Sequence, residues 1–370
     1  MRIALVHDDF VQAGGAESLF ATIASLFPQA PIYTSLVDWT KLPTSISRER
    51  IKTSFMQKIP FAKYLYKTLL PLYPLAFESF DFEGFDLVIS STTRFANSII
   101  TKPHTIHISY VNSIPRFLWD RKIQKDYLPP ALRFFLSPLL KWLKRWDKVT
   151  SSRVDFYIAN SQNIARKIKK AYGRENTVVY PFANTNFFTP AKIHNWGLRE
   201  QNYYLVVTRL VKWKKIDIAI KATQDLDLNL KIVGTGPDEA RLKKIAGSKK
   251  IEFPGKTTVE QLRDLYRNCL ALVVTQEEDF GIAAVEAQSC GRPAIVLASS
   301  GAKESILAEK TGVVFGKQTA ESLKDAIIRT SGLKWNVPGI RRNALRYSKT
   351  VFVKSLTNVI NSYVQERPRS

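Results

Sequence analysis

Short and almost continuously apolar runs recur along the chain, separated by turn residues and by segments with apolar positions at helical spacing. The runs cover residues 3–7, 85–90, 104–110, 154–159, 203–208, 230–234, 270–275 and 293–298. Near-continuous hydrophobic strands that alternate with helices are typical of parallel sheets covered by helices on both faces. The pattern predicts two α/β domains.

Residues 181–197 show no clear period and contain Pro, Asn and Gly, which indicates a linker between these domains. We place the first domain at 1–185, the second at 186–350 and a terminal helical segment at 351–370. Periodicity leaves open whether this last segment packs back on the first domain.

Composition narrows the class of protein. The 370 residues are 45% apolar and 24% charged, which excludes wholesale disorder. Two cysteines cannot form a disulfide framework, and four histidines make the chain poor in metal ligands, so a reducing compartment is expected. Two acidic residues, Asp8 and Asp9, follow the first apolar run, which is therefore too short for a signal peptide. No apolar run reaches the roughly 18 residues of a membrane span. We expect a cytoplasmic protein.

Among the composition values, the formal net charge of +23 is the unusual one. We count 25 basic and 14 acidic residues before Ala183, and 30 and 18 from there on, so each half carries a similar excess. This charge favours acidic partners: nucleic acid, an anionic membrane or phosphorylated small molecules.

Three segments follow predicted strands and carry candidate chemistry. Gly14 and Gly15 open a helix, where bare backbone N–H groups can bind phosphate, although an ordinary tight turn explains them equally well. Arg209 and Lys214 lie between a strand and a helix, where two cations can neutralise a diphosphate; a solvated basic helix start is the alternative.

The third segment contains Glu278 and Glu286, separated by seven residues around a DFG turn. Both carboxylates can face one pocket, with the N-terminal amides of the helix from Gly281 to Ala283 meeting an anion between them. The alternative is a solvated Glu286, but its apolar neighbours leave little solvated face there.

The order of these motifs along the chain is similar to that of a known enzyme family. The order of Gly14-Gly15, Asn160-Ser161, Arg209 with Lys214, Glu278-x7-Glu286 and Cys290-Gly291-Arg292-Pro293 resembles the family 4 glycosyltransferases, which are retaining enzymes with the GT-B fold. Residues 53–82, 85–96 and 113–120 look like the mannosyltransferase-type branch that builds bacterial surface polysaccharides. The resemblance implies an α/β fold of two Rossmann-like parallel-sheet domains that face each other across a cleft.

The resemblance also implies roles for single residues. Arg209 and Lys214 match the family's diphosphate-binding pair, Glu286 the carboxylate that holds the ribose, and Glu278 the one near the transferred sugar. The expected donor-binding residues are Gly14, Gly15, Arg209, Lys214, Glu278, Phe280, Gly281, Ile282, Ala283 and Glu286. Cations and helix dipoles would stabilise the leaving group, so neither a metal nor a cofactor is expected.

Asn112 stands where many family members have a histidine. An amide can hydrogen-bond a sugar hydroxyl but cannot take a proton, which favours a mechanism in which the leaving phosphate accepts the acceptor's proton. Nearby, His104 and His107 alternate along an apolar run, and we expect both to be packed rather than catalytic.

In the segment 128–148, Ser137 and Pro138 predict the start of a helix, which carries aromatic and apolar residues on one face and basic residues on the other. Trp142, Trp146, Lys144 and Arg145 are the expected membrane contacts, and a helix docked on its own domain is the alternative. A second basic and aromatic stretch at 58–73 supports the membrane. We therefore expect peripheral association with the inner face of the cytoplasmic membrane.

The leading hypothesis is a retaining hexosyltransferase that moves mannose from GDP-mannose to a lipid-linked or saccharide acceptor. A UDP-sugar transferase is the nearest alternative, with a nucleotide-sugar epimerase behind it. A basic nucleic-acid-binding protein is the alternative from another class, and the even spread of charge counts against it.

Overall fold

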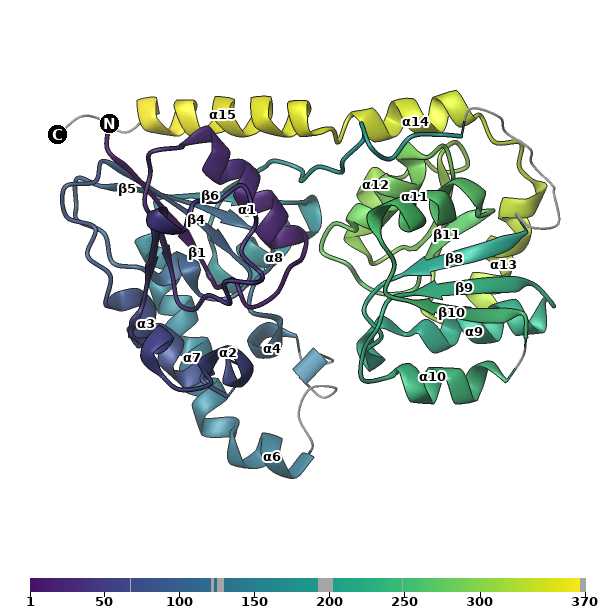
Figure 1. Ribbon diagram of the computed structural model, residues 1–370, viewed down its shortest axis with the longest axis horizontal. Helices are drawn as coiled ribbons and strands as arrows, with labels where there is room; N and C mark the ends of the chain where they lie inside the picture. The colour runs from purple at the N-terminus through teal and green to yellow at the C-terminus, as the bar shows by residue number, and fades with distance from the viewer. Residues whose placement is uncertain (67, 121–122, 125–129, 192–201, 248, 367–370) are drawn as a thin grey trace. The chain divides into compact units, whose positions relative to one another are not determined.

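The computed structural model describes residues 1–66, 68–120, 123–124, 130–191, 202–247, 249–366. The chain divides into two compact units: residues Met1–Tyr180 with Val353–Ser370, and residues Pro181–Phe352. The boundaries expected from the sequence were 185 and 350. Each unit holds its own parallel sheet (Figure 1).

The N-terminal unit contains a seven-stranded sheet in the order β3-β2-β1-β4-β5-β6-β7. Its strands are β1 (Ile3–His7), β2 (Ile32–Thr34), β3 (Ile51–Thr53), β4 (Leu87–Thr92), β5 (Ile106–Val111), β6 (Phe156–Ala159) and β7 (Asn176–Val178). Its helices are α1 (Gly15–Leu26), α2 (Ala62–Leu65), α3 (Tyr73–Glu78), α4 (Arg116–Trp119), α6 (Pro130–Phe135), α7 (Ser137–Thr150) and α8 (Gln162–Tyr172).

The C-terminal unit contains a six-stranded sheet in the order β10-β9-β8-β11-β12-β13. Its strands are β8 (Tyr203–Val207), β9 (Asn229–Val233), β10 (Ile251–Gly255), β11 (Ala271–Val274), β12 (Ala294–Leu297) and β13 (Gly312–Phe315). Its helices are α9 (Ile216–Asp225), α10 (Glu239–Ala246), α11 (Val259–Asn268), α12 (Ile282–Ser289), α13 (Ala320–Gly332) and α14 (Val337–Leu345).

Helices cover both faces of the C-terminal sheet, as the apolar runs predict. Along β8, Tyr204 and Val206 pack into one hydrophobic cluster, whereas Tyr203 and Leu205 pack into another. Because successive strand residues point to opposite faces, a strand with both sets buried lies between two layers of helices. Helices α9, α10 and α13 supply the first cluster, and α11 and α12 supply the second (Figure 1).

The terminal helix α15 (Lys349–Glu366) contributes to the N-terminal unit from Val353 onward. The ring of Tyr363 stacks on Phe156 at a centroid distance of 4.2 Å, and its hydroxyl hydrogen-bonds Thr177 at 2.6 Å. The sequence left open whether this last segment packs on the first domain. These two contacts show that α15 packs on β6 and β7 of the N-terminal unit.

The predicted linker at 181–197 is partly wrong. Phe188 is buried in a core cluster of the C-terminal unit, and the Arg267 guanidinium donates a hydrogen bond to the Thr189 carbonyl at 2.7 Å. Irregular backbone hid this packing, because one buried phenylalanine gives no period. Residues 192–197 of the predicted linker lie outside the described residues.

The expectation for the two histidines is half right. His107 is buried in β5, where its Nε2 lies 2.9 Å from the Ser90 hydroxyl, and burial lowers its pKa to about 4. His104 instead lies in an exposed turn before the strand. The Thr105 N–H donates to the Lys102 carbonyl at 2.9 Å within this turn, and the strand begins only at Ile106.

One carboxyl in the N-terminal unit is buried without a cation beside it. Asp147, on α7, accepts hydrogen bonds from the Trp119 indole (2.7 Å) and the Tyr172 hydroxyl (2.9 Å), and burial raises its pKa to about 7. The unfolded carboxyl titrates near 4, so the folded state holds the extra proton between about pH 4 and 7. The free energy of unfolding therefore falls as pH rises through this window.

We expect Asp147→Asn to raise the free energy of unfolding at pH 8 by on the order of 2 kcal/mol and to flatten its decline between about pH 4 and 7. Urea unfolding at several pH values measures both. Asp325→Asn, at an exposed position on α13, is the control. Equal pH dependence in Asp147→Asn and the native protein would contradict the assignment.

Candidate functional site

At the carboxyl edge of the C-terminal sheet, two glycines allow the loop after β9 to lie directly against the loop after β8. Gly234 has a φ of 127°, and a Cβ there would lie 2.0 Å from the Thr208 carbonyl oxygen. A Cβ on Gly236 would lie 2.2 Å from the Leu210 carbonyl oxygen. The Leu210 amide donates to Thr235 across the same contact at 3.0 Å. These glycines hold the loop that carries Arg209, and the sequence analysis gave them no role.

Lys214 and Glu278 meet at this edge. The loop after β8 carries the lysine and the loop after β11 the glutamate; Nζ and Oε1 lie 2.5 Å apart. Lys214 is buried, with its ammonium 4.3 Å from the centre of the Trp213 ring, whereas Glu278 keeps 24% of its side chain exposed. The sequence analysis assigned Lys214 to the diphosphate and Glu278 to the transferred sugar. In the structure the two side chains form one ion pair.

Neighbouring side chains fix this pair in place. The Gln276 amide donates to Glu278 Oε1 at 2.6 Å, and the Glu278 backbone N–H donates to the Ser300 hydroxyl at 2.9 Å. On the other side, the Thr275 hydroxyl donates to the Lys214 carbonyl at 2.8 Å. The pair is preorganised, so a ligand would meet charges that need little rearrangement.

The turn before α12 is equally confined. Gly281 has a φ of 87°, and a Cβ there would lie 2.6 Å from the Cβ of Ala302. No side chain caps the helix at Gly281. Ile282 and Ala283 form the first turn of α12, where helix N–H groups have no partner within the helix. The anion contact expected at Gly281, Ile282 and Ala283 stays a prediction.

Phe280 is among the expected donor-binding residues, and its contact with a donor stays a prediction. Only 3% of Phe280 is exposed, and its ring packs 5.4 Å from that of Tyr347. An aromatic side chain of this size is more stable in the core than against a charged ligand. Its backbone can still shape the turn.

Glu286 lies on α12, one turn into the helix. It is half-buried, and its Oε2 accepts a hydrogen bond from the buried Tyr266 hydroxyl at 2.8 Å. Burial raises the pKa of this carboxyl, while the tyrosine bond opposes that rise by stabilising the charged form. Arg209, by contrast, is an exposed side chain in the loop after β8.

The N-terminal unit positions its own candidates at the carboxyl edge of its sheet. Asn112 directly follows β5; its Nδ2 donates to the Ser91 hydroxyl at 2.9 Å, and its carbonyl accepts from Asn160 at 2.8 Å. Gly14 caps α1 without a side-chain bond, and Gly14 and Gly15 are exposed. Contacts of these three residues with a donor stay a prediction.

A charged cluster beside them escaped the sequence analysis. Asp9 is buried after β1 and pairs with the Arg94 guanidinium after β4, and the Tyr73 hydroxyl donates to Asp9 at 3.0 Å. The carboxylate holds the pKa of Arg94 above its usual range despite burial. Its neighbour Asp8 accepts backbone bonds from Phe95 and Ala96, both at 2.8 Å. The His-Asp-Asp sequence at the end of the first strand was the available signal.

The four residues on helix α7 that were predicted to touch a membrane have different surroundings in the structure. The Trp146 ring packs 5.4 Å from Phe95 and its indole donates to Glu78 at 3.1 Å, so this tryptophan holds the helix to its own unit. The Lys144 ammonium lies 4.4 Å from the centre of the Trp119 ring. Trp142 and Arg145 are exposed. The helix is thus docked along one stripe and exposed along another.

Two features are absent from the part of the chain that the structure describes. None of its helices combines the length and apolarity that crossing a bilayer requires. Within the same residues, His, Cys, Asp and Glu side chains nowhere gather in a group of three that could hold a metal ion.

Two parallel-sheet Rossmann-like units define an α/β protein with the GT-B fold, and solved structures share it. Sucrose-phosphate synthase from Thermosynechococcus elongatus has a TM-score of 0.76 at 16% identity, over 99% of this chain and 100% of that one. The lipopolysaccharide outer core galactosyltransferase WaaB has a TM-score of 0.69 at 16% identity, over 98% and 100%. Anabaena HepE, solved in complex with UDP, has a TM-score of 0.70 at 17% identity, over 98% and 100%.

Residues 190–336, which lie in the C-terminal unit, match the family described as "Glycosyl transferases group 1". An uncharacterized glycosyltransferase of Methanocaldococcus jannaschii, MJ1178, is 26% identical over 49% of this chain and 51% of its own length. D-inositol 3-phosphate glycosyltransferase of Mycobacteroides abscessus is 27% identical over 47% and 43%. The chain spans 43% to 66% of the length of the first four curated relatives it matches.

Proposed function

We propose that this protein is a retaining, metal-independent glycosyltransferase that takes a hexose from a nucleoside diphosphate sugar. The observation that carries the proposal is the preorganised Lys214–Glu278 pair at the carboxyl edge of the glycosyltransferase group 1 domain. Ligands of open parallel sheets bind at this edge. The sequence similarity to glycosyltransferases supports the same reaction class.

In the proposed reaction, the bond between the sugar's anomeric carbon and the diphosphate oxygen breaks while a bond to the acceptor oxygen forms on the same face. The leaving diphosphate takes the acceptor's proton. Lys214, Arg209 and the first N–H groups of α12 would stabilise the charge that develops on the diphosphate, and Glu278 would bind the sugar. Glu286 would bind the ribose, and Asn112 would orient the sugar by hydrogen bonding.

The proposed donor is GDP-mannose, and a UDP-sugar is the alternative. The alternative gains weight because the HepE structure contains UDP. The expected result of incubation with GDP-, UDP-, ADP- and dTDP-sugars is release of one nucleoside diphosphate, undiminished by EDTA, with retained anomeric configuration by NMR. An inverted product, or release that requires a divalent cation, would contradict this mechanism.

A lipid-linked acceptor in surface-polysaccharide assembly belongs to the same proposal, because the N-terminal unit presents a surface suited to an anionic membrane. Phe134 (77% exposed), Phe135 (75%) and Trp142 (50%) project from α6 and α7, and Lys141 and Arg145 lie exposed on α7. Exposed aromatic residues beside basic ones are typical of interfacial binding.

We expect Phe134→Ser/Phe135→Ser/Trp142→Ser to lose co-sedimentation with anionic vesicles, because burying the three rings supplies the apolar contact. Lys141→Glu/Arg145→Glu should also lose co-sedimentation, because each basic residue near the surface contributes about 1 kcal/mol to binding of an anionic membrane. Ile328→Ser, exposed on α13 of the other unit, is the control. Unchanged co-sedimentation of both variants would remove the membrane from the proposal.

A further inference from the structure

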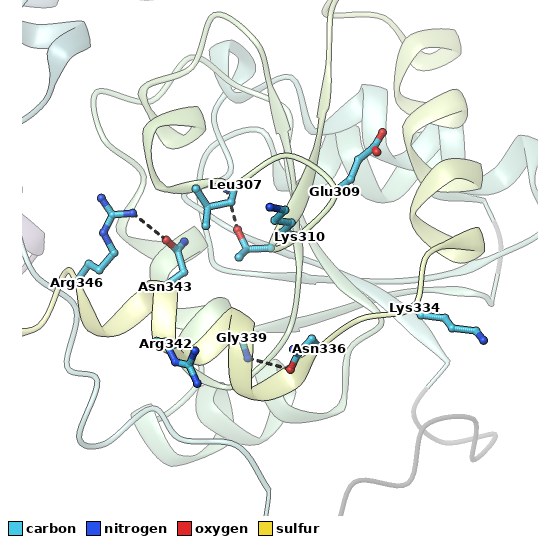
Figure 2. A pocket seen from close by; sticks show the side chains of 10 residues that line it. Leu307, Glu309, Lys310, Lys334, Asn336, Gly339, Arg342, Asn343 and Arg346 are labelled. Carbon is cyan, nitrogen blue, oxygen red and sulfur yellow. Dashed lines mark hydrogen bonds between the residues drawn. The ribbon is translucent and has the colours of Figure 1, made fainter.

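A cavity of about 490 Å³ lies in the C-terminal unit, away from the candidate donor site. It is bounded by the turn Leu307–Thr311, which directly precedes β13, and by α14 (Figure 2). The donor-site loops follow the carboxyl ends of β8 and β11. Because all strands of this sheet are parallel, the turn before β13 belongs to the opposite edge.

The charge of this cavity is strongly one-sided. Four cations line it against one acid, Glu309; the cations are Lys310, Lys334, Arg342 and Arg346. All four are exposed, and among the described residues none of them forms an ion pair within 4 Å. Cations concentrated in a concave site raise the local concentration of anions.

One of these cations, Arg346, is bonded to a buried side chain of the core. Asn343 is buried at the floor, and its Nδ2 donates to Gln288 Oε1 at 2.8 Å and to the Ser305 carbonyl at 2.7 Å. The Arg346 guanidinium reaches Asn343 Oδ1 at 3.4 Å (Figure 2). The exposed Arg346 is thus hydrogen-bonded to a side chain that the core of the unit holds in place.

The opposite wall is closed by reciprocal bonds within the turn. The Leu307 N–H donates to the Thr311 hydroxyl at 2.9 Å, and the Thr311 N–H donates to the Leu307 carbonyl at 2.8 Å. Lys310 lies inside this turn, between Arg346 and Lys334 in the view of Figure 2. Three of the cations thus project from a preformed wall or helix.

The chemistry of the lining selects among anions. Among the described residues that line the cavity, none is aromatic, and Leu307 is the large apolar one. A nucleotide base would lack a stacking partner, whereas a sugar with phosphate or carboxylate groups needs cations and hydrogen bonds. A volume of this size falls within the range of small-molecule sites. We infer that this cavity binds a saccharide that carries two or more phosphate or carboxylate groups, independently of the proposed transfer reaction.

Titration calorimetry of the full chain with fructose 1,6-bisphosphate tests this site, with neutral fructose as the matched ligand. We expect one bound bisphosphate per chain and no heat from fructose. Arg342→Glu/Arg346→Glu should weaken binding at least tenfold, and Lys310→Ala severalfold. Lys221→Glu/Lys244→Glu, an equal charge reversal at exposed positions on α9 and α10, should leave it unchanged.

Three outcomes would overturn the inference. The bisphosphate does not bind; the two double variants weaken binding equally, which would reduce it to the general positive charge; or saturating GDP or UDP displaces it, which would place it at the donor edge. Circular dichroism of each variant confirms that the unit is folded before binding is compared.

Discussion

Lys214→Met is expected to lower kcat/KM for the nucleotide sugar by about 10²- to 10³-fold, the loss found when one preorganised donor to a developing charge is removed. The substitution keeps an unbranched apolar stem but removes the ammonium that lies 2.5 Å from Glu278. It also leaves Glu278 without its cation in a half-buried position, so the melting temperature should fall as well.

A second variant separates these two effects. Lys214→Met/Glu278→Gln leaves no unpaired charge, so we expect stability to recover while turnover stays low. Lys212→Met removes an exposed lysine from the same short helical turn, Lys212–Lys214, and serves as the control. Activity within threefold of native in Lys214→Met, or an equal loss in Lys212→Met, would remove the lysine from the mechanism.

Glu286→Ala should raise KM for the donor on the order of 10²-fold, because a charge-assisted bond to a ribose hydroxyl is lost. Tyr266→Phe tests how the carboxylate is tuned. Its hydroxyl donates to Glu286 and stabilises the charged form, so its removal should raise the pKa of Glu286. The acid limb of the pH profile of donor KM should then move to higher pH.

Tyr203→Phe is the matched control for this shift. Tyr203 is also a buried tyrosine of the C-terminal unit, but its hydroxyl donates to the Leu265 carbonyl at 2.9 Å. An acid limb that moves equally in Tyr203→Phe and Tyr266→Phe would report altered packing rather than the Glu286 carboxyl, and the ribose assignment would lose its support.

The strands that could be predicted are those buried on both faces. Residues 203–208 and 270–275 read as apolar runs because helices cover both sides of β8 and β11. β2, β3 and β7 have three residues each, and β10 includes Pro254 and Gly255, so their apolar signal is too short or too interrupted. β3, β7 and β10 are edge strands and β2 lies next to an edge, and each is held by parallel pairing with strands that are distant in the sequence.

The members of the candidate site were predictable, but their pairings were not. Arg209, Lys214, Glu278 and Glu286 could be singled out because each stands next to a buried strand or helix. The bond between Lys214 and Glu278 joins residues 64 apart, and that between Tyr266 and Glu286 joins residues 20 apart. Amphipathic spacing likewise could not divide α7, since Trp142 and Trp146 show the same pattern while packing differently.

The central claim is that the carboxyl edge of the C-terminal sheet binds the diphosphate of a nucleotide sugar. Titration calorimetry with GDP and UDP, in EDTA, compares the native chain with Lys214→Met and Lys212→Met. We expect one nucleoside diphosphate per chain, with at least tenfold weaker binding in Lys214→Met and native affinity in Lys212→Met. Binding of neither nucleotide to the native chain, or equal affinity in all three proteins, would contradict the claim.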